Sequence, residues 1–153
     1  MIVIKVDYRE KTLTKKLNLL LMDYEYENVE IEVENLPLGD MTVSRKDKDG
    51  GLEELLIFER KTLNDLASSI KDGRYSEQSY RLNNVEHHNH NIIYLIEGNL
   101  STWTNKYKVQ ANTLHSAIFS LNYYKGFSVH KTNDMTETAE YLLRVCDKLN
   151  RSQ

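Results

Sequence analysis

Residues 55–65 read Leu-Leu-Ile-Phe-Glu-Arg-Lys-Thr-Leu-Asn-Asp, and this stretch decides the fold. Its first four residues are apolar, as in a buried strand, and charged residues follow at once. Because side chains alternate along a strand, we expect Glu59 and Lys61 on one face and Arg60 on the other. A carboxylate and an ammonium group would then lie side by side at the end of an interior strand.

A second carboxylate is expected from upstream. Gly39-Asp40 precedes the strand-like residues 41–45, and the polar residues 46–50 are typical of a hairpin loop. A hairpin would bring Asp40 near Glu59, because antiparallel partners lie side by side. Two carboxylates can hold a hard cation, which stabilises charge on a phosphate and acidifies a bound water that Lys61 can orient or deprotonate. The pattern predicts a metal-dependent phosphodiester site with Mg²⁺, for which Mn²⁺ would substitute.

Each of these residues also has an ordinary explanation. Glu-x-Lys is common on surfaces as a pair of solvated charges, and Asp is common in turns. The interior strand favours a functional explanation, because the cost of desolvation offsets the attraction within a buried ion pair.

The series Gly39-Asp40, then Glu59-Arg60-Lys61 and Asp65, resembles the Gly-Asp … Glu-Arg-Lys-x-x-x-Asp motif of the XPF family of structure-specific endonucleases. Residues 6–10, Val-Asp-Tyr-Arg-Glu, are similar to the family's opening Val-Asp-x-Arg-Glu. Residues 65–82, 94–98 and 126–139 resemble later parts of the family's domain in the same order. The likeness covers nearly all of the chain. It implies a three-layer α/β/α fold of the restriction-endonuclease type with a central mixed sheet.

The resemblance also implies roles for individual residues. Catalytic roles fall to Asp40, Glu59, Lys61, Asp7 and Arg60, with Asp40, Glu59 and Asp7 as the metal-binding acids. Supporting or DNA-contacting roles fall to Arg9, Glu10, Asp65, Arg74, Gln78 and Arg81. Simpler explanations stay open: a strand-to-helix cap for Asp7 and Glu10, an exposed helix acid for Asp65, and a solvated helix face for the last three.

Apolar spacing predicts strands alternating with helices, which is typical of an α/β fold with a mixed sheet. We expect strands at 2–7, 29–34, 41–45, 54–60, 92–97 and 127–131. We expect helices at 10–22, 62–71, 74–86, 109–124 and 134–149, with Gly126 as a left-handed cap.

The length and composition predict one domain with a hydrophobic core of its own. The chain has 153 residues, 40% of them hydrophobic and 28% charged, with a net charge of −3 and one cysteine. These values predict a single domain over residues 1–153. The resemblance implies that it is a nuclease domain, and we expect in it neither the helix-hairpin-helix module nor the helicase domain that such nucleases often carry. They also predict an intracellular location, nuclear in a eukaryote and cytoplasmic in a microbe or virus, and no membrane partner. Net acidity predicts weak DNA affinity for this domain alone.

Two apolar stripes lie in the last third of the chain. One comprises Leu114, Ile118, Leu121 and Tyr124, and the other Tyr141, Leu142, Val145 and Leu149. They either cover the sheet or, as the resemblance implies, pair two nuclease domains through residues 109–149, in a homodimer or with a different partner.

We therefore predict a Mg²⁺-dependent endonuclease that cuts branched, flapped or forked DNA. Three alternatives remain: a non-catalytic DNA-binding subunit of a nuclease heterodimer, a scaffold module, and a restriction or RNA-cleaving enzyme of the same fold. Metal-dependent cleavage separates the first two from an active nuclease.

Overall fold

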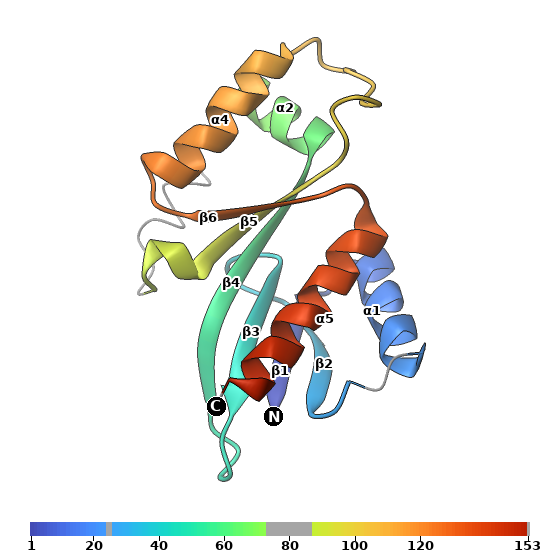
Figure 1. Cartoon of the computed structure of the whole chain (residues 1–153), viewed down its shortest axis with the longest axis vertical. Coiled ribbons are helices and arrows are strands. Elements are labelled where there is room, and N and C mark those ends of the chain that lie inside the picture. The colour runs from blue at the N-terminus through green and yellow to red at the C-terminus, as the bar shows by residue number, and fades with distance from the viewer. Residues whose placement is uncertain (24–25, 73–86, 153) are drawn as a thin grey trace. The chain divides into compact units, whose positions relative to one another are not determined.

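The computed structural model describes residues 1–23, 26–72 and 87–152 (Figure 1). The chain divides into two compact units: the first unit is Met1–Phe58 with Met135–Gln153, and the second unit is Glu59–Asp134. The elements are, in chain order, β1 (Ile2–Asp7), α1 (Lys11–Asp23), β2 (Val29–Glu34), β3 (Met41–Lys46), β4 (Leu52–Thr62), α2 (Leu63–Asp72), the short 3-10 helix Asn89–Asn91, β5 (Ile92–Glu97), α4 (Ala111–Tyr123), β6 (Ser128–Thr132) and α5 (Met135–Arg151).

The predicted mixed sheet is confirmed. Its strand order is β2-β1-β3-β4-β5-β6. Strand β1 runs parallel to β2 and antiparallel to β3, β3 is antiparallel to β4, and β5 is parallel to β6. Strand β4 begins in the first unit and ends in the second. Each strand and α-helix agrees with its predicted range to within two residues at either end, and the helix expected at 74–86 lies outside the described residues.

The core of the first unit forms between β1 and two helices. Helices α1 and α5 pack against each other, and α5 also contacts β1. Leu13 and Leu17, four residues apart on α1, are buried, as are Leu142 and Leu143 of α5. Each such side chain contributes about 1.5–3 kcal/mol by leaving water. Cys146 is buried as well, and burial raises the pKa of its thiol to about 12, so it is a packing residue.

The second unit is built on β5, every residue of which is buried. Helix α4 packs against β6 and α2. Leu114, Ile118 and Leu121 provide this packing and are 0%, 8% and 0% exposed. The expectation that these three residues form a pairing surface is therefore wrong, because they are already covered within their own unit. Gly126 follows the helix with φ +75°, as the sequence predicts.

No helix among the described residues combines the length and apolar character needed to cross a bilayer.

Candidate active site

The predicted site residues of the first unit lie where β1 and β3 meet. The Asp7 N–H donates to the Asp40 carbonyl oxygen at 2.9 Å, and the Asp40 N–H donates to the Phe58 carbonyl oxygen at 2.8 Å. Backbone hydrogen bonds thus connect Asp7, Asp40 and Phe58 across three strands. Glu59 is the residue that follows Phe58 in the chain. The predicted hairpin is confirmed, with Asp47 bonding the N–H groups of Asp49 and Gly51 in its loop.

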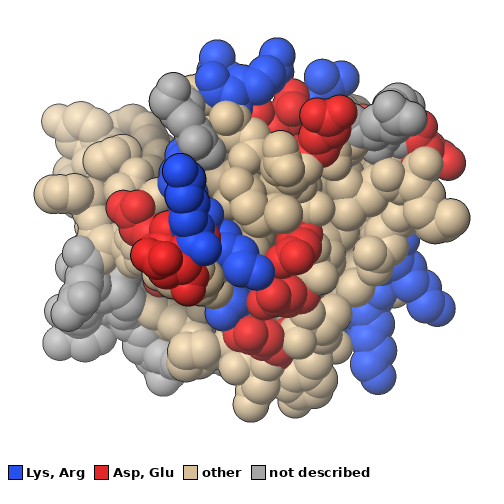
Figure 2. Space-filling view, turned by 90° about the horizontal axis from the view of Figure 1, so that it is seen from below, with Lys and Arg blue, Asp and Glu red and all other residues tan. Residues whose placement is uncertain are grey.

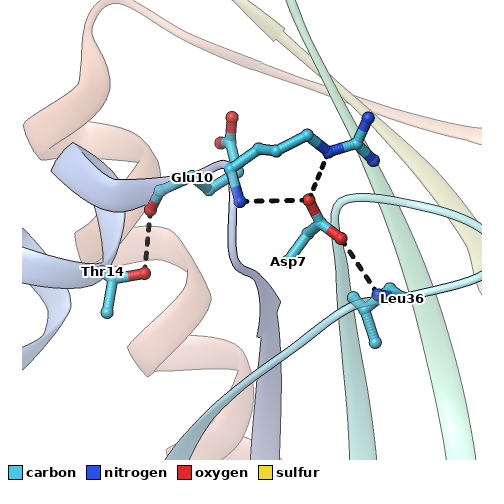
Figure 3. A network of polar contacts seen from close by, with 5 residues as sticks. Asp7, Glu10, Thr14 and Leu36 are labelled. Carbon is cyan, nitrogen blue, oxygen red and sulfur yellow. Dashed lines mark hydrogen bonds and ion pairs between the residues drawn. The ribbon is translucent and has the colours of Figure 1, made fainter.

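The Asp7 carboxylate is buried and held by three donors (Figure 3). One oxygen accepts a hydrogen bond from the Leu36 N–H at 3.0 Å. The other accepts from the Arg9 N–H at 3.2 Å and from Arg9 Nε at 2.7 Å. Burial alone would raise the pKa of this carboxyl, but the hydrogen bonds from Arg9 and Leu36 outweigh it, so the pKa lies below its usual value. Asp7 is therefore a fixed anion at neutral pH.

Arg9 carries its guanidinium into solvent, with 66% of the side chain exposed. Its hydrogen bond to Asp7 raises its pKa, as does the charge of Asp7, with smaller contributions from Tyr8 and Asp40. Glu10 stands just before α1, where its carbonyl oxygen accepts from the Thr14 N–H at 3.0 Å and the Thr14 hydroxyl at 2.8 Å (Figure 3). An acidic side chain at this position is also stabilised by the partial positive charge at the N-terminus of the helix.

Gly39 allows the turn that leads into Asp40. Its φ is +80°, and a Cβ there would lie 2.6 Å from Ile57 Cγ2 and 3.2 Å from the Phe58 carbonyl oxygen. A side chain at position 39 would therefore strain the backbone and also clash with Ile57 and Phe58 of β4.

We expect Gly39→Ala to lower the stability of the protein by about 1–3 kcal/mol and to reduce any activity that needs Asp40 in place. Gly50→Ala is the matched control, because Gly50 has a similar φ of +84° but no atom within 4 Å of the position that a Cβ would take. Thermal melting of both variants measures the difference. Equal losses of Tm would show that the contact with β4 is unimportant.

The second unit holds the Glu-Arg-Lys residues at the end of β4. Lys61 Nζ lies 3.8 Å from Glu59 Oε1, and each side chain is 12% exposed. Arg60 makes two bonds to the Glu97 carboxylate, from Nε at 3.0 Å and from Nη2 at 2.6 Å. The pairing of Glu59 with Lys61, and the different partner of Arg60, agree with the alternation expected along the strand.

Sequence reasoning did not identify Glu97 as part of this group. It ends β5, after five apolar residues, and the residue is 7% exposed. A carboxylate in such a run needs a charged partner, and this is the signal that could have identified it. Asp65 was expected to support Arg60 or Lys61; it lies exposed in the first turn of α2, where its N–H bonds the Thr62 hydroxyl at 3.1 Å. Arg74, Gln78 and Arg81 lie outside the described residues.

Charges on the surface are mixed in sign. Figure 2 shows acidic and basic side chains next to one another on the face in view, without a continuous basic area. Within the described part of the chain, no three side chains of the His, Cys, Asp or Glu type are arranged to hold a metal ion by themselves.

The model of the family described as "ERCC4 domain" matches residues 6–145. The chain belongs to the ERCC4 domain family. This confirms the predicted membership of the XPF family of nucleases, since this chain is also similar to the structure of XPF from Aeropyrum pernix. That structure matches 99% of this chain and 66% of its own chain, with 27% identity and a TM-score of 0.70; its complex with DNA matches with a TM-score of 0.71.

Curated relatives of this ERCC4 domain include two crossover junction endonucleases. The one named MUS81 from Arabidopsis thaliana is 32% identical over 142 residues, which cover 90% of this chain and 20% of the relative. The probable mus81 enzyme of Dictyostelium discoideum is 29% identical over 156 aligned residues, 93% of this chain and 17% of the relative. The chain thus spans about a fifth of the length of these relatives.

Proposed function

We propose that this ERCC4 domain is the nuclease part of a structure-specific DNA endonuclease that hydrolyses phosphodiester bonds in branched, flapped or forked DNA. The observation that carries the proposal is the Glu59–Lys61 pair at the end of β4. The names of the related endonucleases and the DNA complex of the Aeropyrum structure support the same substrate class. A protein with this substrate would work in the nucleus of a eukaryote or the cytoplasm of a microbe.

Asp40 and Glu59 are the residues that would hold Mg²⁺. Met41 of β3 is opposite Phe58 of β4; Asp40 directly precedes Met41 in the chain, and Glu59 directly follows Phe58. Their carboxylates fit Mg²⁺, which binds through one or two protein carboxylates together with water and substrate phosphate. Both oxygens of Asp7 already accept hydrogen bonds, which suits it to support this end of the sheet. When bound, the metal would supply charge stabilisation at the phosphate and a more acidic water.

Two basic residues would then act on the substrate. Lys61, held beside Glu59, can orient the attacking water, and in its neutral amine form it can accept the proton of that water. Arg9 is exposed and fixed at Nε by Asp7, so its planar fork is oriented before a phosphate arrives.

A cleavage panel tests the proposal directly. Flap, fork, nicked and four-way junction DNAs are incubated with the protein in Mg²⁺, in Mn²⁺ and in EDTA. We expect metal-dependent cutting of at least one branched substrate in preference to linear duplex. Cutting that persists in EDTA, or no cutting of any substrate, would overturn the assignment.

We further propose that the chain pairs through the end of α4. Phe119, Tyr123 and Tyr124 are 55%, 68% and 75% exposed. Their ring centroids lie 5.0–6.1 Å apart. Clustered aromatic side chains in solvent are typical of protein interfaces, and a second copy in a two-fold arrangement is the partner we expect. Within the predicted pairing region of residues 109–149, the proposed contact surface is therefore this exposed aromatic group at the end of α4.

Tyr123→Glu should convert the dimer to a monomer, because a charge would be buried in the interface. Ala111→Glu is the control, since Ala111 is also exposed on α4 but lies eight residues, more than two helical turns, before Phe119. Light scattering at roughly tens of micromolar measures the mass. A monomeric wild-type protein would contradict the homodimer and favour a different partner chain.

A further inference from the structure

We infer that Glu97 is a positioning residue, which fixes the end of β4 by holding Arg60 and thereby sets the Glu59–Lys61 pair. This inference rests on the proposed nuclease function, because it assigns Arg60 a task within that site. It also gives Arg60 a role other than the direct catalytic role that the resemblance implies.

The geometry of the Arg60–Glu97 pair supports positioning. Two hydrogen bonds of 3.0 and 2.6 Å join the guanidinium to both carboxylate oxygens. The side chains are only 12% and 9% exposed. A two-point bond of this kind fixes the orientation as well as the distance of both groups. Because a buried ion pair adds little net stability, the Arg60–Glu97 pair is better explained by the position it gives to the end of β4 than by stabilisation of the fold.

A second contact holds the same two chain segments together. Gly98, directly after Glu97, has φ +136°, and a Cβ at this position would lie 2.8 Å from Leu63 Cγ. Leu63 is the first residue of α2, two positions after Lys61. The Gly98 N–H also donates to the Thr132 carbonyl oxygen on β6 at 2.8 Å. The residues on both sides of Lys61 are thus held against the end of β5.

The charge and burial of Arg60 also support a positioning role. With its charge compensated by Glu97 and its side chain largely buried, Arg60 presents little positive charge to solvent. Arg9, in contrast, is exposed to solvent. Because only 12% of the Arg60 side chain is exposed, its guanidinium offers a substrate phosphate little accessible surface.

Arg60→Gln, Glu97→Gln and the double variant test the inference in the purified protein. Cleavage of a flap DNA in Mg²⁺ gives kcat and KM, and fluorescence anisotropy in EDTA gives the DNA Kd. We expect each variant to lower kcat about tenfold or more, with KM and Kd changed by less than about twofold. The double variant should lose no more than the worse single variant, because the two residues act as one pair.

Asp147→Asn is the matched control, since it removes a surface ion pair with Arg151 at 2.8 Å and should change nothing. If a single variant fails to fold, the double variant decides, because it leaves no buried charge unpaired. A phosphate contact would behave differently: Arg60→Gln would raise KM and Kd while Glu97→Gln kept full kcat, and this result would overturn the inference.

Hydrogen exchange separates this inference from the proposed function. In Glu97→Gln, the backbone amides of residues 59–62 should exchange faster, while those of β1 stay as in the wild type. This measurement needs no activity. If the wild type cuts no DNA, the proposed function fails and exchange alone decides whether Glu97 positions β4. Unchanged exchange at residues 59–62 would overturn the positioning role.

Discussion

Asp40→Asn and Glu59→Gln should each lower the rate of Mg²⁺-dependent DNA cleavage by about a thousandfold, because losing a metal ligand removes several kcal/mol of charge stabilisation. The fold should survive both changes. The hydrogen bonds that connect Asp40 to Asp7 and Phe58 come from the backbone, so an amide side chain leaves them intact. Single-turnover cleavage of a flap DNA measures the rates, and thermal melting checks the fold.

Asp49→Asn is the control for these two variants. Asp49 is an exposed acid of the β3–β4 hairpin loop, and its replacement removes the same charge away from the site. We expect wild-type cleavage from it. Folded Asp40→Asn or Glu59→Gln protein with full activity would show that these carboxylates do not bind the catalytic metal.

Lys61→Ala should lower kcat about a hundredfold or more while DNA affinity stays nearly unchanged, as expected for a group that acts on the water in the transition state. The ammonium group lies 3.8 Å from Glu59 and is only 12% exposed, which is unfavourable for a general phosphate contact. Steady-state kinetics and anisotropy measure the two effects separately.

Lys131→Ala serves as the comparison for Lys61→Ala, because Lys131 is exposed on β6 and its replacement removes one positive charge from the same unit. Both variants should show the same small change in Kd. If Lys61→Ala instead raised Kd and left kcat unchanged, Lys61 would be a binding residue.

The sequence determined the secondary structure and most of the candidate site. Local patterns were sufficient for the strands 2–7, 29–34 and 92–97, since apolar and polar residues alternate or run together according to which faces are buried. The pairing of Glu59 with Lys61 followed from strand alternation alone. Family membership followed from short motifs, each of a few neighbouring residues, that occur along nearly all of the chain in the family's order.

Tertiary structure decided which charges pair over long sequence distances. Arg60 and Glu97 are 37 residues apart, and the hydrogen bond between Asp7 and Leu36 spans 29, so no local periodicity could reveal them. Tertiary structure also decided which side of α4 is exposed to solvent. Leu121 and Tyr124 belong to one apolar stripe in the sequence, yet packing covers the first fully and leaves the second 75% exposed. An apolar pattern predicts that a face will be buried, but only the neighbouring elements determine how much of it they cover.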